Sequence, residues 1–218
     1  MKRFYILALL LALAACGTKP VRLHTGDLIF VGIPEDYRIS GSFAEAISTS
    51  TNPDSLNIIH TAIAEVKGDS VWIIDATIKH GVDRHPLDTF LKDFTLKDGS
   101  YPTLIVKRLK DDKDAARYVE RARGYTGLGY NRCFIPCDTA LYCTELVRDS
   151  YRRPDGSYIF GEAPMNFKAP DGTMPEYWTE LFDILGMDVP QGVPGTNPRS
   201  MMEEKCLKDV GLLTSLLR

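Results

Sequence analysis

The chain has 218 residues, of which 44% are hydrophobic, and a formal net charge of −3 at neutral pH. This length is enough for one domain with a sizeable hydrophobic core. The basic residues form no strong patch, so the composition argues against nucleic acid as a partner. The chain contains no internal repeat and no low-complexity segment.

The first residues of the chain have the form of an export signal. The basic pair Lys2-Arg3 precedes the apolar run Phe4–Ala14, and small residues follow. The run is shorter than the roughly 20 residues that a membrane-spanning helix needs. These features predict an exported protein, and ordinary secretion would account for them.

A cysteine directly after the small residues makes the prediction more specific. The order Leu13-Ala14-Ala15-Cys16 resembles the signal of bacterial lipoproteins. The resemblance implies that residues 1–15 are removed, that Cys16 becomes lipidated, and that residues 16–22 form a linker. Several acyl chains together hold a protein stably on a membrane. We therefore expect a lipid-anchored, periplasm-facing protein of the cell envelope.

Alternating apolar residues and turn residues predict an early group of strands. Thr61–Val66 alternates between two faces, Lys67–Ser70 has the composition of a hairpin turn, and Val71–Ala76 reads as the returning strand. Further strands are predicted at Asp27–Val31, Gly81-Val82 and Thr103–Leu109.

Helical patterns surround these strands. The stretch from Pro154 to Pro198 is crowded with proline and glycine, so we expect it to be mostly loop. Together with the strands, the helices predict an α+β fold in which helices flank a small antiparallel sheet. The predicted helices are Gly41–Ser48, Pro86–Phe94, Lys113–Arg123, Ala140–Tyr151 (capped by Asp138 or Thr139), a helix near Trp178–Leu185, and Ser200–Val210.

The cysteines after the signal leave several arrangements open. They are Cys133, Cys137, Cys143 and Cys206. In an exported protein cysteines tend to pair, so Cys133 and Cys137 could close a small loop, or either could pair with Cys206. The spacing of the first three lacks the further ligands of a zinc site. We therefore expect no metal and no other cofactor.

Three residues together have the chemistry of a cysteine hydrolase. His60 opens one predicted strand, Asp75 closes the next, and Cys143 falls in the first turn of a predicted helix. Unpaired N–H groups at a helix start favour a thiolate, and so does a nearby imidazolium. His60 would serve as general base, with Asp75 fixing its orientation. The backbone N–H of Cys143 is a candidate for stabilising an oxyanion.

Two other histidines are weaker candidates for the base. His80 and His85 flank the short strand Gly81-Val82, and His85 precedes the proline that is predicted to start a helix. We interpret His85 as a residue of the helix entry. Each of the three chosen residues also has an ordinary structural interpretation, because buried cysteines, hydrogen-bonded histidines and turn aspartates are common.

The sequence around the three residues resembles a known superfamily. Gly26–Phe30, His60 at a strand start, Ile73–Ala76 and Gly81-Val82 look like the strand core of NlpC-type papain-like hydrolases. Usual members place the nucleophilic cysteine before this block, whereas here it follows, in the segments Gly127–Asn131 and Leu141–Val147. This order of motifs, and the sequence around the cysteine, resemble the circularly permuted branch, the YaeF/YiiX-type papain-like amidases. The cysteine motif of that branch reads Tyr-Cys-Ser-Glu-Leu-Val.

The resemblance covers roughly Leu23 to Val210, and the segment Gly195-Thr196-Asn197-Pro198 also contributes to it. It implies a permuted papain-like domain over residues 23–218. It further implies Cys143 as nucleophile, His60 as base and Asp75 as orienting residue. Tyr142 and Glu145 would lie next to the site, and Tyr130 would line the substrate pocket, although Glu145 could serve only to support the helix start. The sequence departs from the branch at Thr144, where serine is more common, and at Asp75, where Glu or His is often found.

The substrate follows from the resemblance only as a class. NlpC-type relatives cut cell-wall stem peptides, which suits an envelope location and an amide substrate. The permuted branch also resembles enzymes that act on acyl lipids. A third possibility is an envelope-binding lipoprotein that has lost catalysis, which an unreactive or disulfide-bonded Cys143 would indicate.

Overall fold

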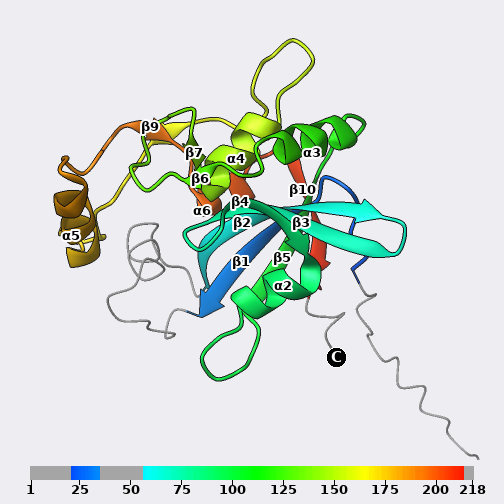
Figure 1. Cartoon of the computed structure of the whole chain (residues 1–218), viewed down its shortest axis with the longest axis horizontal. Helices are drawn as coiled ribbons and strands as arrows, with labels where there is room; N and C mark the ends of the chain where they lie inside the picture. Colours follow the sequence, from blue (N-terminus) through cyan, green and yellow to red (C-terminus); the bar gives the residue numbers. More distant parts are fainter. Residues whose placement is uncertain (1–20, 35–55, 214–218) are drawn as a thin grey trace, which may run out of the picture.

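The structure is a computed structural model that describes residues 21–34 and 56–213 (Figure 1). The predicted signal peptide, the lipidation site Cys16 and the predicted helix Gly41–Ser48 lie outside the described residues. Within the described ranges, no helix is both long enough and apolar enough to cross a membrane.

A six-stranded antiparallel sheet forms the centre of the molecule, with strand order β10-β5-β1-β2-β3-β4. Every adjacent pair of strands runs antiparallel. This arrangement confirms the predicted α+β class and the predicted early strands. The strands are β1 (Leu28–Pro34), β2 (Leu56–Lys67), β3 (Ser70–Thr77), β4 (Gly81–Pro86), β5 (Thr103–Leu109) and β10 (Leu207–Leu212).

The predicted hairpin between β2 and β3 is confirmed. The two strands meet at Lys67 and Ser70, and Gly68 in the turn has a φ of 58°, which glycine adopts without steric cost. The start of β2 differs from the prediction. The strand begins at Leu56, so His60 lies inside it rather than at its first position.

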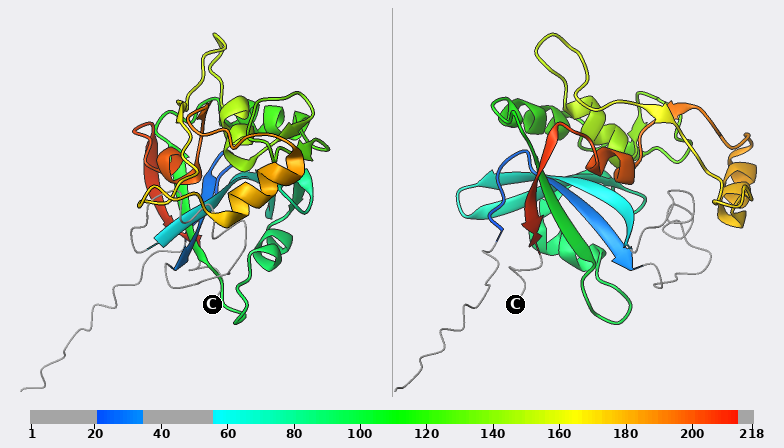
Figure 2. Two further views of the ribbon diagram at one scale, coloured as in Figure 1. Left: turned by 90° about the vertical axis from the view of Figure 1, so that its left-hand side faces the viewer. Right: turned by 180° about the vertical axis from the view of Figure 1, so that it is seen from behind.

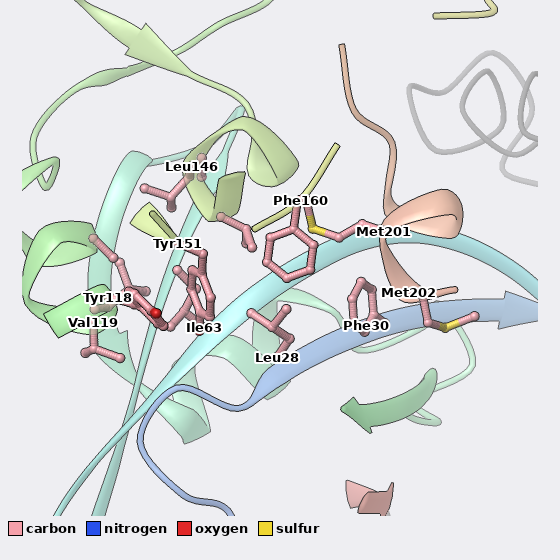
Figure 3. Close-up of a cluster of buried hydrophobic side chains, with 14 of the residues drawn as sticks. Leu28, Phe30, Ile63, Tyr118, Val119, Leu146, Tyr151, Phe160, Met201 and Met202 are labelled. Atoms are coloured by element: carbon pink, nitrogen blue, oxygen red, sulfur yellow. The ribbon is translucent and has the colours of Figure 1, made fainter. Parts of the chain in front are cut away.

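Helices cover both faces of the sheet (Figures 1 and 2). On one face α3 (Ala115–Gly124), α4 (Cys143–Ser150) and α6 (Pro198–Met202) enclose the larger core, to which the strands contribute residues such as Leu28 and Phe30 (Figure 3). On the other face α2 (Leu87–Asp93) packs Phe90 and Leu91 against alternate residues of the same strands. The period-two alternation of the strands therefore separates two hydrophobic layers.

The proline- and glycine-rich stretch forms a third apolar cluster beside the sheet. It holds α5 (Glu176–Leu185) and the short paired strands β8 (Ala163–Pro164) and β9 (Pro194–Gly195). Trp178 and Phe182 of α5 are buried there. The predicted helix near Trp178–Leu185 is thus confirmed within a mostly irregular segment.

The helix predicted over Ala140–Tyr151 is wrong at its start. Ala140–Leu141 forms strand β7, which pairs in parallel with β6 (Gly129–Tyr130), and α4 begins only at Cys143. Neither Asp138 nor Thr139 caps it, because Tyr142 is the extended residue before the helix. A pairing partner eleven residues away holds the backbone extended, and a local pattern does not reveal such a partner.

The last predicted helix, Ser200–Val210, is also wrong. The chain forms the short helix α6 and then strand β10, which pairs antiparallel with the edge strand β5. The side chain of Asn197 accepts a hydrogen bond from the backbone N–H of Ser200 at 2.8 Å and caps α6. An unpaired sheet edge favours strand formation in a segment whose apolar spacing fits a helix as well.

The Gly-Asp pair before β1 connects several elements. Asp27 is fully buried and accepts hydrogen bonds from Nε and Nη2 of Arg108 on β5, at 2.5 and 2.8 Å. Gly26 has a φ of 87°, and a Cβ at this position would lie 2.7 Å from the Cβ of Ala115. The hydroxyl of Tyr151 donates to the carbonyl of Gly26 at 3.0 Å. The motif therefore ties β1 to β5, α3 and the end of α4.

We predict that Asp27→Ala lowers the free energy of unfolding by about 3–5 kcal/mol, because it leaves the largely buried charge of the Arg108 guanidinium without its carboxylate partner. The measurement is chemical denaturation of the two proteins. The double variant Asp27→Leu/Arg108→Met should lose less, because no charge remains unpaired. Asp111→Ala, which breaks an exposed pair with Lys113, is the control and should leave the midpoint unchanged. Equal losses for Asp27→Ala and Asp111→Ala would contradict the prediction.

Candidate active site

The strands β2 and β3 separate at one point, and two of the predicted site residues lie there. The ladder between them runs from the turn to the pair Ile63 and Ile74. Beyond this pair β2 continues along β1 to Leu56, while β3 continues along β4 to Thr77. Nε2 of His60 lies 2.8 Å from Oδ2 of Asp75 in this fork, and both side chains are buried.

The predicted nucleophile, Cys143, lies at the same place although it is far from His60 and Asp75 in the sequence. Cys143 is the first residue of α4, whose buried residues Leu146 and Val147 pack on the sheet. Its thiol lies close enough to His60 for the two side chains to interact and for Cys143 to raise the pKa of the imidazole. Since Asp75 occupies Nε2 of the imidazole, Nδ1 is the ring nitrogen left for the thiol. The fold therefore brings together Cys143, His60 and Asp75.

The electrostatics of the group favour a charged imidazole. Burial pulls the pKa of His60 down, but the charge of Cys143 and the hydrogen bonds with Asp75 and Cys143 outweigh it and raise the pKa of His60 to about 10. An imidazolium beside a thiolate is the ground state that papain-like chemistry uses. The backbone N–H of Cys143 belongs to the first turn of α4, where N–H groups have no partner within the helix.

A hydrogen-bond network fixes the start of α4 to the segment before α6. The hydroxyl of Thr144 donates to the carbonyl of Thr196 at 3.1 Å, and the two hydroxyls lie 2.8 Å apart. The backbone N–H of Thr196 donates to the hydroxyl of Tyr142 at 3.2 Å. Thr144 stands where the related motif has serine, and it keeps the hydroxyl that these contacts use.

Glu145 supports the helix start from the other side. Its Oε2 accepts hydrogen bonds from the backbone N–H of Tyr142 at 3.2 Å and from Nδ2 of Asn131 at 3.1 Å. Burial raises the pKa of Glu145 to about 7, although these two hydrogen bonds oppose the shift. The side chain does not line the cavity described next, so its position fits the supporting role.

A cavity of about 240 Å³ opens beside Cys143. Its walls include Phe134, Phe167 and Trp178, whose rings make T-shaped, edge-to-face contacts with one another. None of the described residues that line the cavity is charged. Tyr130 and Tyr142 lie in the wall, and burial raises the pKa of both phenols, that of Tyr142 to about 12. The full lining set is Tyr130, Phe134, Tyr142, Cys143, Thr144, Ala163, Pro164, Met165, Asn166, Phe167, Trp178, Thr196, Asn197, Pro198 and Ser200.

The cysteines of the described segments are all free thiols, so Cys143 is not held in a disulfide. Cys133, Cys137 and Cys206 form none of the pairings that the sequence left open. The described residues also contain no group of three or more His, Cys, Asp or Glu side chains arranged to hold a metal ion.

Sequence reasoning assigned no role to Asn131 and Thr196, which hold the helix start in place. Both lie in segments that contributed to the family resemblance, Gly127–Asn131 and Gly195–Pro198, and this was the available signal. His85 was interpreted as a helix-entry residue. It does directly precede Pro86, the N-cap of α2, but its side chain is also buried on β4, with Nε2 at 3.7 Å from Oδ1 of Asp75.

A helix that carries a cysteine at its first turn, packed on an antiparallel sheet that carries a histidine and an acidic partner, defines a papain-like cysteine hydrolase. The chain belongs to the family described as "permuted papain-like amidase enzyme, YaeF/YiiX, C92 family", whose model matches residues 22–211. The protein is thus a papain-like cysteine amidase or peptidase with a permuted order of elements, as the sequence indicated.

A solved structure has the same fold. The crystal structure of metalloprotein yiiX from Escherichia coli O157:H7 superimposes with a TM-score of 0.65 at 22% sequence identity, and the match covers 87% of this chain and 97% of the other. No curated protein matched the chain. At this level of sequence identity the similarity establishes the fold but not the substrate.

We predict that Cys143→Ser lowers the pKa of His60 from about 10, because it removes the neighbouring thiolate while burial continues to favour the neutral ring. The measurement is an NMR titration of the four histidine rings. The raised pKa of His60 also predicts a pH limit for activity. The imidazolium of His60, which would protonate a leaving group, is lost as the pH rises through 10. Cys206→Ser is the control, and a His60 titration unchanged in Cys143→Ser would contradict the pairing.

We predict that Glu145→Gln stabilises the protein at pH 8 by on the order of 1–3 kcal/mol but has little effect at pH 5. The pKa of Glu145 is raised to about 7 in the folded protein, so the folded protein binds this proton more tightly than the unfolded chain. The resulting contribution to stability is complete below about pH 4.3 and is lost as the pH rises through 7. Denaturation midpoints of both proteins at the two pH values measure this difference. An equal gain at both values would mean that ionisation of Glu145 is not the cause.

Proposed function

We propose that the protein hydrolyses an amide bond by nucleophilic catalysis, with Cys143 as nucleophile, His60 as general base and acid, and Asp75 as the residue that orients His60. The observation that carries the proposal is the contact of one buried imidazole with both Cys143 and the carboxylate of Asp75. The thiolate attacks the carbonyl carbon, and the backbone N–H of Cys143 donates to the resulting oxyanion.

The remaining steps follow from the same contacts. The imidazolium of His60 gives its proton to the leaving amine as the C–N bond breaks, and a thioester remains on Cys143. His60, now neutral, takes a proton from water as the water attacks the thioester. The acid product leaves, and the thiolate and the imidazolium are restored.

The cavity supports a substrate with an uncharged, largely apolar group on the acyl side. Aromatic and methionine side chains line it next to Cys143, and its described lining residues provide no charged partner for a substrate. Cell-wall stem peptides, the substrate class expected first, carry carboxylates along their length. An N-acyl amide or a related acyl lipid therefore fits the described walls better, and Tyr130 and Tyr142 would contact it.

The location is part of the proposal and rests on the sequence alone. The signal-like residues 1–15 and Cys16 support a lipid anchor in the cell envelope. Such an anchor would hold the enzyme beside a membrane, where acylated substrates are abundant. We therefore propose a periplasm-facing, membrane-attached hydrolase.

We predict that iodoacetamide labels Cys143 rapidly at pH 6–7 and that His60→Ala slows this labelling by at least about tenfold, since an ordinary thiol ionises near pH 8.5. Peptide mass mapping measures the labelling of each cysteine. Cys206, whose thiol pKa is raised by burial, is an internal control that should label slowly in both proteins. Slow labelling of Cys143 that does not depend on His60 would contradict the hydrolase proposal and favour a binding protein.

The substrate class is tested with the same protein. N-acyl amides of increasing chain length and purified muropeptides are offered in parallel, and the thioester on Cys143 is detected by mass spectrometry. Adducts from the acyl amides that increase with chain length, and decrease in Trp178→Ala, are the expected result. Adducts from muropeptides alone would indicate that the substrate is a cell-wall peptide.

A further inference from the structure

The two oxygens of Asp75 have unlike surroundings. Oδ2 is 2.8 Å from Nε2 of His60, whereas Oδ1 is buried without a hydrogen-bond partner among the described residues. A buried carboxylate oxygen without a donor loses the hydrogen bonds that water gives it in the unfolded chain, which destabilises the fold. It also leaves the carboxylate free to rotate away from His60. A donor for Oδ1 would therefore serve both stability and alignment.

His85 is placed to be that donor. Its Nε2 lies 3.7 Å from Oδ1 of Asp75, and this nitrogen is likewise buried with no hydrogen-bond partner in the described part of the chain. A shift of a few tenths of an ångström brings the two atoms into hydrogen-bond range. The gap is too short for a bridging water, because two consecutive hydrogen bonds of about 2.8 Å span a longer distance. Two unpartnered atoms of complementary chemistry thus face each other directly.

The surroundings of His85 hold it in this orientation. The residue pairs with Ile73 in the ladder between β4 and β3, and its ring stacks on Phe90 of α2 with an interplanar angle of 17°. The titratable groups that face it are Asp75 from β3, Asp83 from its own strand at 3.4 Å from Nδ1, and His80, whose ring centre is 6.2 Å away. Either the tautomer protonated at Nε2 or the imidazolium donates to Asp75.

We propose that His85 is a positioning residue that donates a hydrogen bond from Nε2 to Oδ1 of Asp75. The carboxylate is then held between two imidazoles, and His60 stays aligned with Cys143. The proposal rests on the proposed roles of Cys143 and His60 and adds a fourth residue to them. His85 does not line the cavity, so its loss affects the reactivity of Cys143 rather than the binding of a substrate.

Two amide substitutions separate positioning from packing. The side-chain nitrogen of Gln reaches about as far as Nε2 of histidine, whereas that of Asn reaches about as far as Nδ1. We expect His85→Asn to slow iodoacetamide labelling of Cys143 at pH 6–7 by about tenfold or more and to move its pH profile toward that of an ordinary thiol. We expect His85→Gln to stay within about threefold of the parent protein.

His80→Ala is the matched control. This neighbouring histidine contacts Asp93 at 3.0 Å and its ring centre lies 6.2 Å from that of His85, but the structure gives it no contact with Asp75. Its labelling profile should equal that of the parent. Thermal melts of all variants establish that each one is folded. Equal profiles for His85→Asn and His85→Gln, or a parent-like profile for His85→Asn, would overturn the role of His85.

The outcome for His85 is separable from that for the hydrolase itself. Labelling that depends on His60 but not on His85 refutes only the positioning role, whereas labelling that is slow in the parent protein refutes the proposed function. NMR of the imidazole nitrogens tests the contact in either case, even where a variant fails to fold. A protected Nε2–H of His85 that shifts in Asp75→Asn supports the hydrogen bond, and an unprotected Nε2 overturns it.

Discussion

The packing of α4 on the sheet is the constraint on which the site depends. Leu146, Val147 and Tyr151 are fully buried against the strands, and the hydroxyl of Tyr151 reaches the backbone of Gly26. These contacts fix both the axis of the helix and its rotation. Cys143 is the first residue of that helix, so the packing of α4 places its thiol at the fork between β2 and β3. The body of the helix thus packs on the sheet, and its first turn holds the candidate nucleophile.

The fork itself explains why a histidine and a carboxylate can share a buried place. Next to the fork, β2 and β3 pair through aliphatic and small residues such as Ile63, Ala64 and Ile74, and an unpaired charge among them would be costly. Where the strands diverge, polar side chains from both strands lie close to one another, and His60 and Asp75 interact directly. His60 enters from β2, Asp75 from β3 and His85 from β4, and the thiol of Cys143 completes the group. A permuted chain order does not disturb it, because the contacts depend on positions in space and not on connectivity.

A second layer of contacts joins distant segments around the helix start. Thr144 and Tyr142 bond to Thr196, and Glu145 bonds to Asn131. The same segments form the walls of the apolar cavity, so the residues that hold Cys143 in place also shape the space beside it. Changes in the Pro154–Pro198 stretch are therefore expected to affect the position of Cys143 as well as the shape of the cavity. The contact between Thr144 and Thr196 also gives a physical reason for the hydroxyl at position 144.

The hairpin, the strand Thr103–Leu109 and the candidates Cys143, His60 and Asp75 could be predicted from the sequence, since turn residues, alternation and motifs are local signals. The strands Ala140–Leu141 and Leu207–Leu212 could be recognised only in the folded chain, because their pairing partners lie elsewhere in the sequence. The tertiary structure alone brought Asn131, Thr196 and His85 to the site. Strand pairing and side-chain proximity arise from contacts between residues far apart in sequence, and a local pattern carries no record of them.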